Sequence, residues 1–527
     1  MRAERLFRAL GLVDAALVEE ALVVRRRLPW RRWAAMAACL AVVISLGLGW
    51  RITGGFRGFG AGGADSGSAG GAPSGSSAGD PAGPGGDVFD GGINDGAAFL
   101  SYAGPVMPLT AGEDPAGLTA ERRVTWDFAP GAYPDGEPRQ WGAEVTDAYV
   151  LSNGGETDIT VTALYPFAGS FSELALPGVT VDGEAVEPAL YAGAYSGGFQ
   201  STYGAETPDT SNLEPLNSWR GYRALLESGA YRERAMGEDP ALEIPVTVYE
   251  FSDFAAPHGE YRAATQAVSF DIDPERTTVL SYGFNGMEWE GNFRRYSYFV
   301  PDGMRNESEV KLLAVLGEDL GDYVLQGYPD GGCGRGEEID GVSCSVTRRE
   351  MTLEAVLDWV CRDSLERYGE DWVSEDGPVN FSMYRRAAAE LLVRYGPLSG
   401  EPMDRYADGR LDDLLMETLG QERVLYLSFP VTVPAGGSVE VECAFWKAPS
   451  CDFGGSGSEN EGLQGYDLVT GLGSSLVFTR QSAELVNLEN VELAGQNFGF
   501  EPEDGVSSVE LDLEQEHYYL EIRPIEE

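Results

Sequence analysis

The chain has 527 residues, of which 43% are hydrophobic and 11% aromatic, so it can form large cores and is not disordered throughout. It carries 37 basic and 85 acidic residues, a formal net charge of −48. A field of this sign repels phosphate backbones and excludes nucleic acid as an expected partner.

An uncharged hydrophobic run covers residues 33–50. As a helix it would be about 27 Å long, close to the hydrocarbon thickness of a bilayer. Trp33 and Trp50 bound the run, and five arginines lie between residues 25 and 32. The positive-inside rule then predicts a single-pass protein of the cell membrane, with a cytoplasmic N-terminus and an extracytoplasmic bulk. A cleaved signal peptide is the alternative, but no clear A-x-A site follows the run.

Residues 1–32 form the predicted cytoplasmic segment, with eight arginines and four acidic residues. Leu6, Leu10, Val13 and Leu17 recur at helical spacing and predict an amphipathic helix. Such a helix either lies on the anionic inner leaflet or docks a cytoplasmic protein partner. We treat these four residues as the candidate docking face.

The run LFRALGLVD at residues 6–14, followed by the WAAMAACL start of the hydrophobic run, resembles the N-termini of single-pass membrane proteins of Gram-positive gut bacteria. Those proteins combine a short arginine-rich cytoplasmic segment with a β-rich ectodomain, and some with similar N-termini look like anti-sigma factors. The segments at 149–167, 447–453 and 496–522 also resemble these ectodomains. The resemblance implies the topology and a regulatory role for the cytoplasmic segment.

Residues 51–98 form a predicted flexible tether, because 32 of the 44 residues from 54 to 97 are Gly, Ser, Ala or Pro. The sequence GSSAG at 75–79 matches the G-x-S-x-G nucleophile pattern. That motif requires a strand, a turn, a helix and a histidine partner, which the tether does not supply. We interpret the match as a consequence of composition.

The exterior is predicted to be mainly β, with antiparallel sandwich regions and a helical insert. Residues 99–345 contain short alternating strands, including an expected hairpin over 145–167, and one short helix near 218–232. Residues 346–422 show helical spacing broken by Pro and Gly, which predicts about three helices. Residues 423–527 return to strand patterns and form a C-terminal β region.

Five cysteines follow the hydrophobic run, and an exported domain can oxidise them. Cys443 and Cys451 flank a short turn and are the first candidate disulfide. Cys333 and Cys344 are a second, weaker candidate, and Cys361 is expected to be buried on a helix. No C-x-x-C occurs, so a cysteine metal site is not expected.

Only two histidines exist, His258 and His517, which removes most histidine-based triads and metal sites. We expect no catalytic residue, cofactor or metal. Glycan hydrolysis that uses carboxylates alone is still an open hypothesis. Its candidate residues are Glu288, Glu290 and Asp371, which lie next to tryptophans in the sequence. A solvated strand face would account for these acidic residues equally well. Two further hypotheses concern binding. A calcium loop could use the oxygen ligands of Asp330, Glu337, Glu338 and Asp340. An aromatic cluster that stacks on sugars could consist of Trp289, Phe293, Tyr296 and Tyr298.

The leading hypothesis is a non-enzymatic, membrane-anchored ectodomain that binds, senses or scaffolds at the cell envelope. Its expected partners are the bilayer through residues 33–50 and an envelope polysaccharide or protein. One alternative is transmembrane signalling, with an anti-sigma-like regulator acting through the cytoplasmic helix. A second alternative is a carboxylate-dependent glycan hydrolase, which requires two facing carboxyl groups in an open aromatic groove.

Overall fold

The computed structural model describes residues 102–525 with several gaps. The gaps are residues 116, 133–137, 140, 193–198, 202–210, 214–218, 230–231, 233–234, 258–260, 262, 301–309, 370–371, 376, 396–397, 399–408 and 452–461. The predicted cytoplasmic segment, with Leu6, Leu10, Val13 and Leu17, lies outside the described residues. So do the predicted transmembrane helix and the tether.

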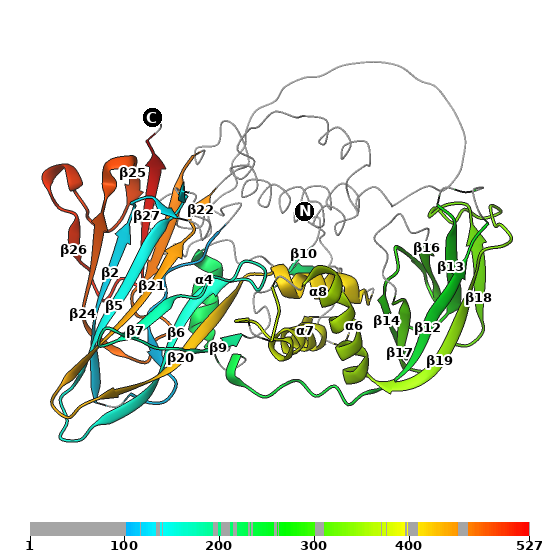
Figure 1. The fold of residues 1–527 in the computed structure, drawn as a ribbon, viewed down its shortest axis with the longest axis horizontal. Helices are drawn as coiled ribbons and strands as arrows, with labels where there is room; N and C mark the ends of the chain where they lie inside the picture. Colours follow the sequence, from blue (N-terminus) through cyan, green and yellow to red (C-terminus); the bar gives the residue numbers. More distant parts are fainter. Residues whose placement is uncertain are drawn as a thin grey trace, which may run out of the picture.

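The described chain is mainly β with several antiparallel sheets, which confirms the predicted fold class at that level. Figure 1 shows two β-rich regions at opposite ends, with helices α6, α7 and α8 between them. The first region combines strands from residues 110–192 with strands from 423–524, and the second uses residues 245–352. The chain therefore leaves the first region, builds the second region and the helices, and returns to complete the first.

A seven-stranded sheet organises the first region (Figure 1). One face of β2 and β5 carries alternating buried residues because it packs on two other sheets, whereas the opposite face is largely open to solvent. In spatial order the strands are β26 (Ser508–Glu510), β24 (Val477–Val486), β2 (Leu118–Asp127), β5 (Ala143–Asn153), β21 (Ser438–Lys447), β7 (Gly178–Val181) and β8 (Glu184–Ala185).

Two four-stranded sheets cover separate halves of that buried face, and each forms its own hydrophobic core with it. The β6–β20 sheet consists of β1 (Thr110–Ala111), β6 (Ile159–Gly169), β20 (Arg423–Val433) and β9 (Ala189–Ala192). The β23–β27 sheet consists of β22 (Ser450–Cys451), β23 (Gln464–Val469), β27 (His517–Pro524) and β25 (Val491–Gln496). Short 3₁₀ turns, η2 (Leu488–Asn490) and η3 (Pro502–Asp504), follow β24 and β25.

The hairpin expected over 145–167 is wrong. Strand β5 pairs with β2 and β21, whereas β6 pairs with β1 and β20, so the two strands belong to facing sheets. The intervening turn is an arch between layers, and the β20–β21 connection forms a second arch beside it. Asn153 links the arches, because its side-chain amide donates to the carbonyls of Thr157 and Val433 at 2.8 and 3.1 Å.

The seven-stranded sheet also contains one parallel pair, β2 with β24, which the expected antiparallel sandwich did not include. The pair joins residues 119–127 to residues 477–486. A parallel pair cannot close through a tight turn and requires a long crossover. Here the crossover includes the whole second β-rich region and the helices.

The second β-rich region is a sandwich of two antiparallel sheets. The β12–β17 sheet contains β14 (Thr277–Tyr282), β17 (Leu312–Gly317), β12 (Pro245–Ala255) and β19 (Ser343–Thr352). The β13–β16 sheet contains β15 (Gly286–Glu290), β16 (Phe293–Phe299), β13 (Thr265–Asp271) and β18 (Tyr323–Tyr328). Two small ribbons lie elsewhere: β3 (Gly131–Ala132) with β4 (Pro138–Arg139), and β10 (Phe199–Ser201) with β11 (Ser211–Leu213).

Strand β17, an interior strand of the β12–β17 sheet, is buried on both faces. Along β17, Leu313 and Val315 belong to the sandwich core, whereas Leu312, Ala314 and Leu316 belong to the core shared with the helices. Because side chains alternate along a strand, the continuous apolar run fits burial on two sides. The sheet therefore joins the sandwich to the helical layer.

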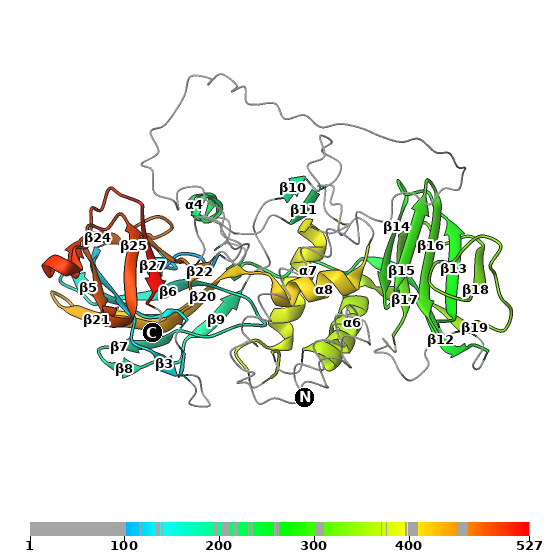
Figure 2. The same ribbon diagram turned by 90° about the horizontal axis from the view of Figure 1, so that it is seen from above.

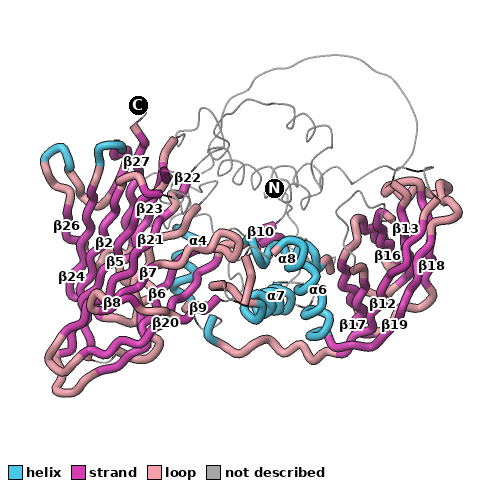
Figure 3. Tube along the Cα trace, viewed as in Figure 1, coloured by secondary structure: helices cyan, strands magenta, loops and turns pink. Residues whose placement is uncertain are grey.

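Three helices form this layer between the β-rich regions, as Figures 2 and 3 show. They are α6 (Leu353–Tyr368), α7 (Phe381–Tyr395) and α8 (Leu411–Gly420), all within the segment predicted to be helical. Thr352 begins α6 as an N-cap, and its hydroxyl accepts the Ala355 N–H at 3.3 Å. A fourth helix, α4 (Trp219–Ser228), lies within the predicted 218–232 segment and packs on the first region.

Arg122 and Asp147 form a fully buried ion pair between the two halves of the seven-stranded sheet's inner face. Two parallel hydrogen bonds of 2.8 Å connect the guanidinium to the carboxylate. Tyr149 and Tyr165 also donate to Asp147, at 2.7 and 3.3 Å, and Arg122 donates to the Val469 carbonyl at 2.6 Å. The Arg122–Asp147 cluster (Arg122, Asp147, Tyr149 and Tyr165) thus connects all three sheets of the first region.

The charge of Asp147 keeps Arg122 ionised in the buried cluster. Burial alone would lower the pKa of Arg122, but the charge of Asp147 reverses the effect and raises it. Burial also raises the pKa of Tyr149 and of Tyr165, which keeps both phenols protonated as donors. Each member therefore depends on the others for its hydrogen bonds.

Asp412 lies in the first turn of α8, where the helical layer meets the β12–β17 sheet. Its carboxylate accepts the Gly283 N–H at 3.0 Å, directly after β14. Burial raises the pKa of Asp412 to about 6, although this hydrogen bond and the charge of Arg410 oppose the rise. The contact between α8 and the sheet is therefore sensitive to pH.

We predict that Asp147→Ala lowers the free energy of unfolding by about 3–5 kcal/mol, because it leaves the buried Arg122 charge uncompensated. Denaturant unfolding followed by tryptophan fluorescence measures the change. The matched control is Asp319→Asn, which breaks the half-exposed pair with Arg348 and should cost about 1 kcal/mol or less. Equal losses in the two variants would contradict the structural role of the cluster.

We also predict that Asp412→Asn reduces the fall in stability between pH 5 and pH 7. The pKa of Asp412 in the folded protein, about 6, exceeds the usual carboxyl value, so its contribution is present at low pH and is lost as the pH rises through 6. The asparagine keeps an acceptor for Gly283 and does not ionise. Thermal midpoints at both pH values measure the effect, and an unchanged fall in stability in Asp412→Asn would contradict the role of this carboxyl.

Candidate functional site

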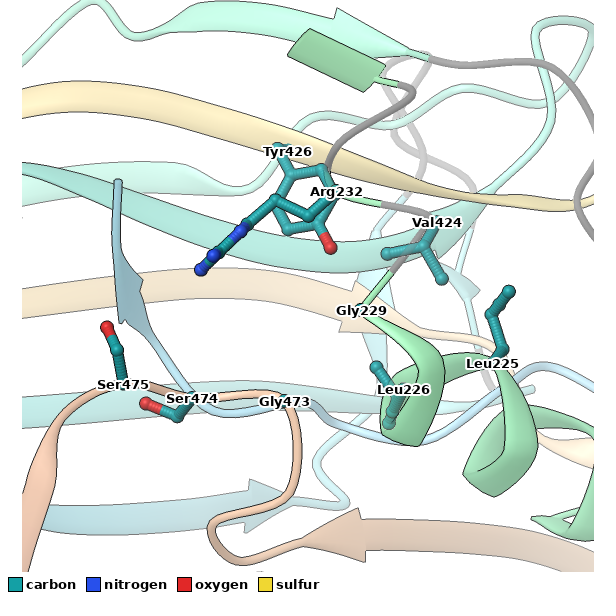
Figure 4. A pocket seen from close by; sticks show the side chains of 9 residues that line it. All are labelled: Leu225, Leu226, Gly229, Arg232, Val424, Tyr426, Gly473, Ser474 and Ser475. Atoms are coloured by element: carbon teal, nitrogen blue, oxygen red, sulfur yellow. The ribbon is translucent and has the colours of Figure 1, made fainter. Parts of the chain in front are cut away.

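A cavity of about 210 Å³ lies on the outer face of the β6–β20 sheet. Figure 4 shows the Arg232 side chain extending beside the Tyr426 ring toward the wall that contains Ser474 and Ser475. Helix α4 closes the opposite end. The complete lining is Leu225, Leu226, Gly229, Arg232, Val424, Tyr426, Gly473, Ser474 and Ser475.

A second cavity, of about 310 Å³, adjoins the first, and both are lined by Arg232 and Ser475. Its wall differs in charge because it contains Glu113 and Asp114, which follow the short strand β1. The remaining lining residues are Ala111, Gly112 and Pro115. We call the two cavities together the α4 groove.

The wall between Gly473 and Ser475 is held by hydrogen bonds to the edge strand β1. Ser474 Oγ donates to the Leu109 carbonyl at 2.6 Å, and the Ser475 N–H donates to Thr110 Oγ1 at 3.0 Å. Gly473 has a φ of +82° and would place a Cβ 3.3 Å from Leu226. A glycine is therefore suited both to the backbone turn and to the close approach of α4.

Arg232 and Tyr426 are two polar groups of the first cavity with unused hydrogen-bonding capacity. Arg232 is half-buried, donates one hydrogen bond of 3.4 Å to the Ala111 carbonyl and makes no ion pair within the described part of the chain. The Tyr426 hydroxyl makes no hydrogen bond among the same residues. Burial raises the pKa of Tyr426 to about 12, and the Arg232 charge partly opposes this rise. The phenol is therefore a neutral donor beside a cation.

Aromatic contacts fix helix α4 and thereby one end of the groove. Trp219 stacks on the His517 ring at a centroid distance of 4.4 Å and an interplanar angle of 9°. His517 Nε2 in turn lies 2.6 Å from Asp467 Oδ1 on β23. One turn further along the helix, the Tyr222 ring lies 5.6 Å from Tyr102. His517 thus serves in a structural contact between α4 and the β23–β27 sheet.

A buried charge pair lies close to the start of the described chain. Lys447 and Glu422 interact electrostatically, and Lys447 Nζ donates to the Ala103 carbonyl. Burial raises the pKa of Glu422 and lowers that of Lys447, while each charge opposes the shift of the other. The pair fixes the segment that leads into β1, so we assign it a structural role.

The predicted disulfides are not formed in this structure, because all five described cysteines are free thiols. Cys333 packs with Ala267 on the outer face of the β13–β16 sheet, whereas Cys344 packs into the sandwich core on the other side. Cys443 lies in β21 and Cys451 in β22, which belong to different sheets. Both pairings stay predictions, and Cys361 is buried on α6 as expected.

Glu288 and Glu290, two of the carboxylates singled out in the sequence, lie in β15 and do not line the α4 groove, whereas Asp371 lies outside the described residues. Glu288 forms an ion pair with Arg295 on the neighbouring strand, and the Trp289 side chain is 52% exposed. The carboxylates that line the groove, Glu113 and Asp114, are consecutive and lie on one wall rather than facing each other. This is not the arrangement that glycan hydrolysis requires.

The calcium and aromatic hypotheses gain no support from the geometry. Among the described residues, no group of three or more His, Cys, Asp or Glu side chains is arranged to hold a metal. Tyr296 and Tyr298 are buried in the sandwich core, and Phe293 is half-buried. Trp289 alone of that cluster is exposed, so these aromatics mainly form the core.

Sequence reasoning missed Arg232, Tyr426 and the Gly473–Ser475 wall. These residues come from segments about 190 and 50 positions apart, and no motif connects them. A weak signal existed in Gly473-Ser474-Ser475, a turn sequence placed directly before a strand. Their proximity depends on the return of the chain to the first region.

No family model matches the chain, and no curated protein sequence matches it. Within the part of the chain that the structure describes, no helix is long and apolar enough to cross a membrane. The predicted span at 33–50 lies outside that part. The α4 groove, with the unused hydrogen-bonding capacity of Arg232 and Tyr426, is therefore the feature on which a function is argued.

Proposed function

We propose that the chain is a single-pass, membrane-anchored protein whose extracytoplasmic β-rich region binds a ligand at the cell envelope without catalysing a reaction. The α4 groove carries the binding part of this proposal, because it holds a half-buried arginine and a phenol that make, respectively, no ion pair and no hydrogen bond with the residues that the structure describes. Groups of this kind gain partners when a ligand enters. The uncharged run at 33–50 and the arginines before it support the anchor.

Binding is favoured over catalysis by the chemistry of the groove. Its serine hydroxyls are engaged in the wall, because Ser474 Oγ donates to the Leu109 carbonyl and Ser475 Oγ shares a hydrogen bond of 3.1 Å with Thr110 Oγ1. Its two carboxylates are neighbours on one wall, and Arg232 cannot act as a base. The arrangement can orient a charged ligand, which is what a binding or sensing ectodomain requires.

Protease treatment of intact cells that express the chain tests the topology. We expect the acidic body to be digested while a fragment containing residues 1–32 stays protected, since the arginines place it inside. Detection uses one antibody against each part, and permeabilised cells are the control in which both parts are digested. Recovery of the full-length protein in the soluble cytosolic fraction would contradict the proposal.

A second candidate function is transmembrane signalling through the cytoplasmic segment, which the helical spacing of Leu6, Leu10, Val13 and Leu17 favours. A helix with such a face can dock a protein partner in place of lying on lipid. An anti-sigma-like role would follow if that partner is a transcription factor.

Leu10→Asp separates the two roles of this helix. For a docking helix, we expect the variant to lose a protein captured by residues 1–32 and to change transcription, because a buried charge disrupts an apolar interface. Membrane insertion, measured by fractionation, should not change. Arg5→Gln is the control on the same segment. Capture of no specific protein by the original segment would exclude the signalling role.

A further inference from the structure

The α4 groove has charges of opposite sign at different places along its length. Arg232 lies where the two cavities meet, with Leu225, Leu226 and Val424 in the first cavity. The second cavity contains Glu113 and Asp114. Glu113 Oε1 already accepts the Thr162 N–H at 2.7 Å, whereas Asp114 makes no hydrogen bond or ion pair among the described residues. A ligand of the whole groove would thus meet an apolar wall, a cation and then a carboxylate.

The net charge of the protein limits the ligands that can reach Arg232. With a net charge of −48, the long-range field repels anions and favours ligands without net negative charge. Arg232 nevertheless requires an acceptor, and a carboxylate matches its fork of N–H donors. A dipolar molecule satisfies both conditions, because it carries a carboxylate and a compensating cation.

We propose that the α4 groove binds a short peptide of two or three residues through its free termini. The C-terminal carboxylate pairs with Arg232 and accepts the Tyr426 hydroxyl, the last side chain is apolar and lies against Leu225 and Val424, and the N-terminal ammonium pairs with Asp114. This inference rests on the proposed binding function and assigns its ligand class.

The dimensions of the groove fit this ligand. An apolar cavity of about 150 Å³ accommodates a benzene ring, so the first cavity, of about 210 Å³, has room for a leucine side chain and a carboxylate. The second cavity, of about 310 Å³, extends the site toward Asp114 by the length of one or two further residues. A single amino acid would leave one of the two charged ends unused.

Isothermal titration of the purified full-length chain with Gly-Gly-Leu tests the proposal. We expect measurable binding of the free tripeptide and a loss of tenfold or more, on the order of one charge-assisted hydrogen bond, when its C-terminus is amidated. N-acetylation should weaken binding less, because Asp114 is exposed. Gly-Gly-Asp is the matched control peptide, and its acidic side chain should prevent binding in the apolar cavity.

Two variants assign the ends of the ligand. Arg232→Gln should bind the free and the amidated tripeptide with equal, weak affinity, whereas Asp114→Asn should affect the free tripeptide and leave the acetylated one unchanged. Arg480→Gln, which alters an exposed pair with Glu510 on the far edge of the seven-stranded sheet, is the control. Unchanged thermal midpoints show that the variants are folded.

Each outcome decides a separate point. If none of the tripeptides gives a binding heat, the ligand class is wrong. If Arg232→Gln still prefers the free tripeptide over the amidated one, the assigned orientation is wrong. Both results are independent of cell topology, so they leave the envelope location to the protease experiment. Conversely, if this chain is found in the cytosol but binds the tripeptide through Arg232, the ligand assignment stands and the proposed location is contradicted.

Discussion

The first β-rich region depends on the buried pair between Arg122 and Asp147. Its members lie between two hydrophobic cores on one face of the seven-stranded sheet, where the half-buried Phe445 packs against both cores. A lone charge at this depth would destabilise the fold, and each ion is tolerated because the other, two tyrosines and one backbone carbonyl satisfy it. The pair therefore fixes how the β6–β20 and β23–β27 sheets are placed side by side.

The order of the chain imposes a second constraint. Strands from residues 110–192 pair partly with one another, but their sheets are completed only after residue 423, since β20, β21 and β24 add to the sheets that β6, β5 and β2 begin. Contacts of such long separation form late and slowly in folding. The second sandwich and the helices are local by comparison, with strand β17 buried between them. This arrangement favours folding of the second sandwich and the helices before the strands after residue 423 complete the first region.

Local sequence patterns predicted the positions of helices and strands, but they did not predict how strands of different layers pair. Helical spacing located α6, α7 and α8, and alternation located β5 and β6, because these patterns reflect burial along one element. The same alternation could not distinguish a hairpin from an arch, since both bury one face of each strand.

Arg122 and Asp147 were not singled out, because a buried charge has the same appearance in sequence as a solvated one. Arg232 and Tyr426 were missed for a related reason: their proximity is a property of the assembled sheets.

The Arg122–Asp147 cluster also accounts for the position of the groove walls. Tyr149 donates to Asp147 and accepts the Leu109 N–H at 2.9 Å, and the Leu109 carbonyl then accepts Ser474 Oγ. Arg122 holds the carbonyl of Val469, the last residue of β23, from which the Gly473–Ser475 wall continues. Both segments of the wall thus begin at hydrogen bonds to the same cluster. A fully buried ion pair has few alternative arrangements, so it gives these two segments a fixed starting point. The position of the groove walls is in this sense determined by the core as well as by contacts within the groove.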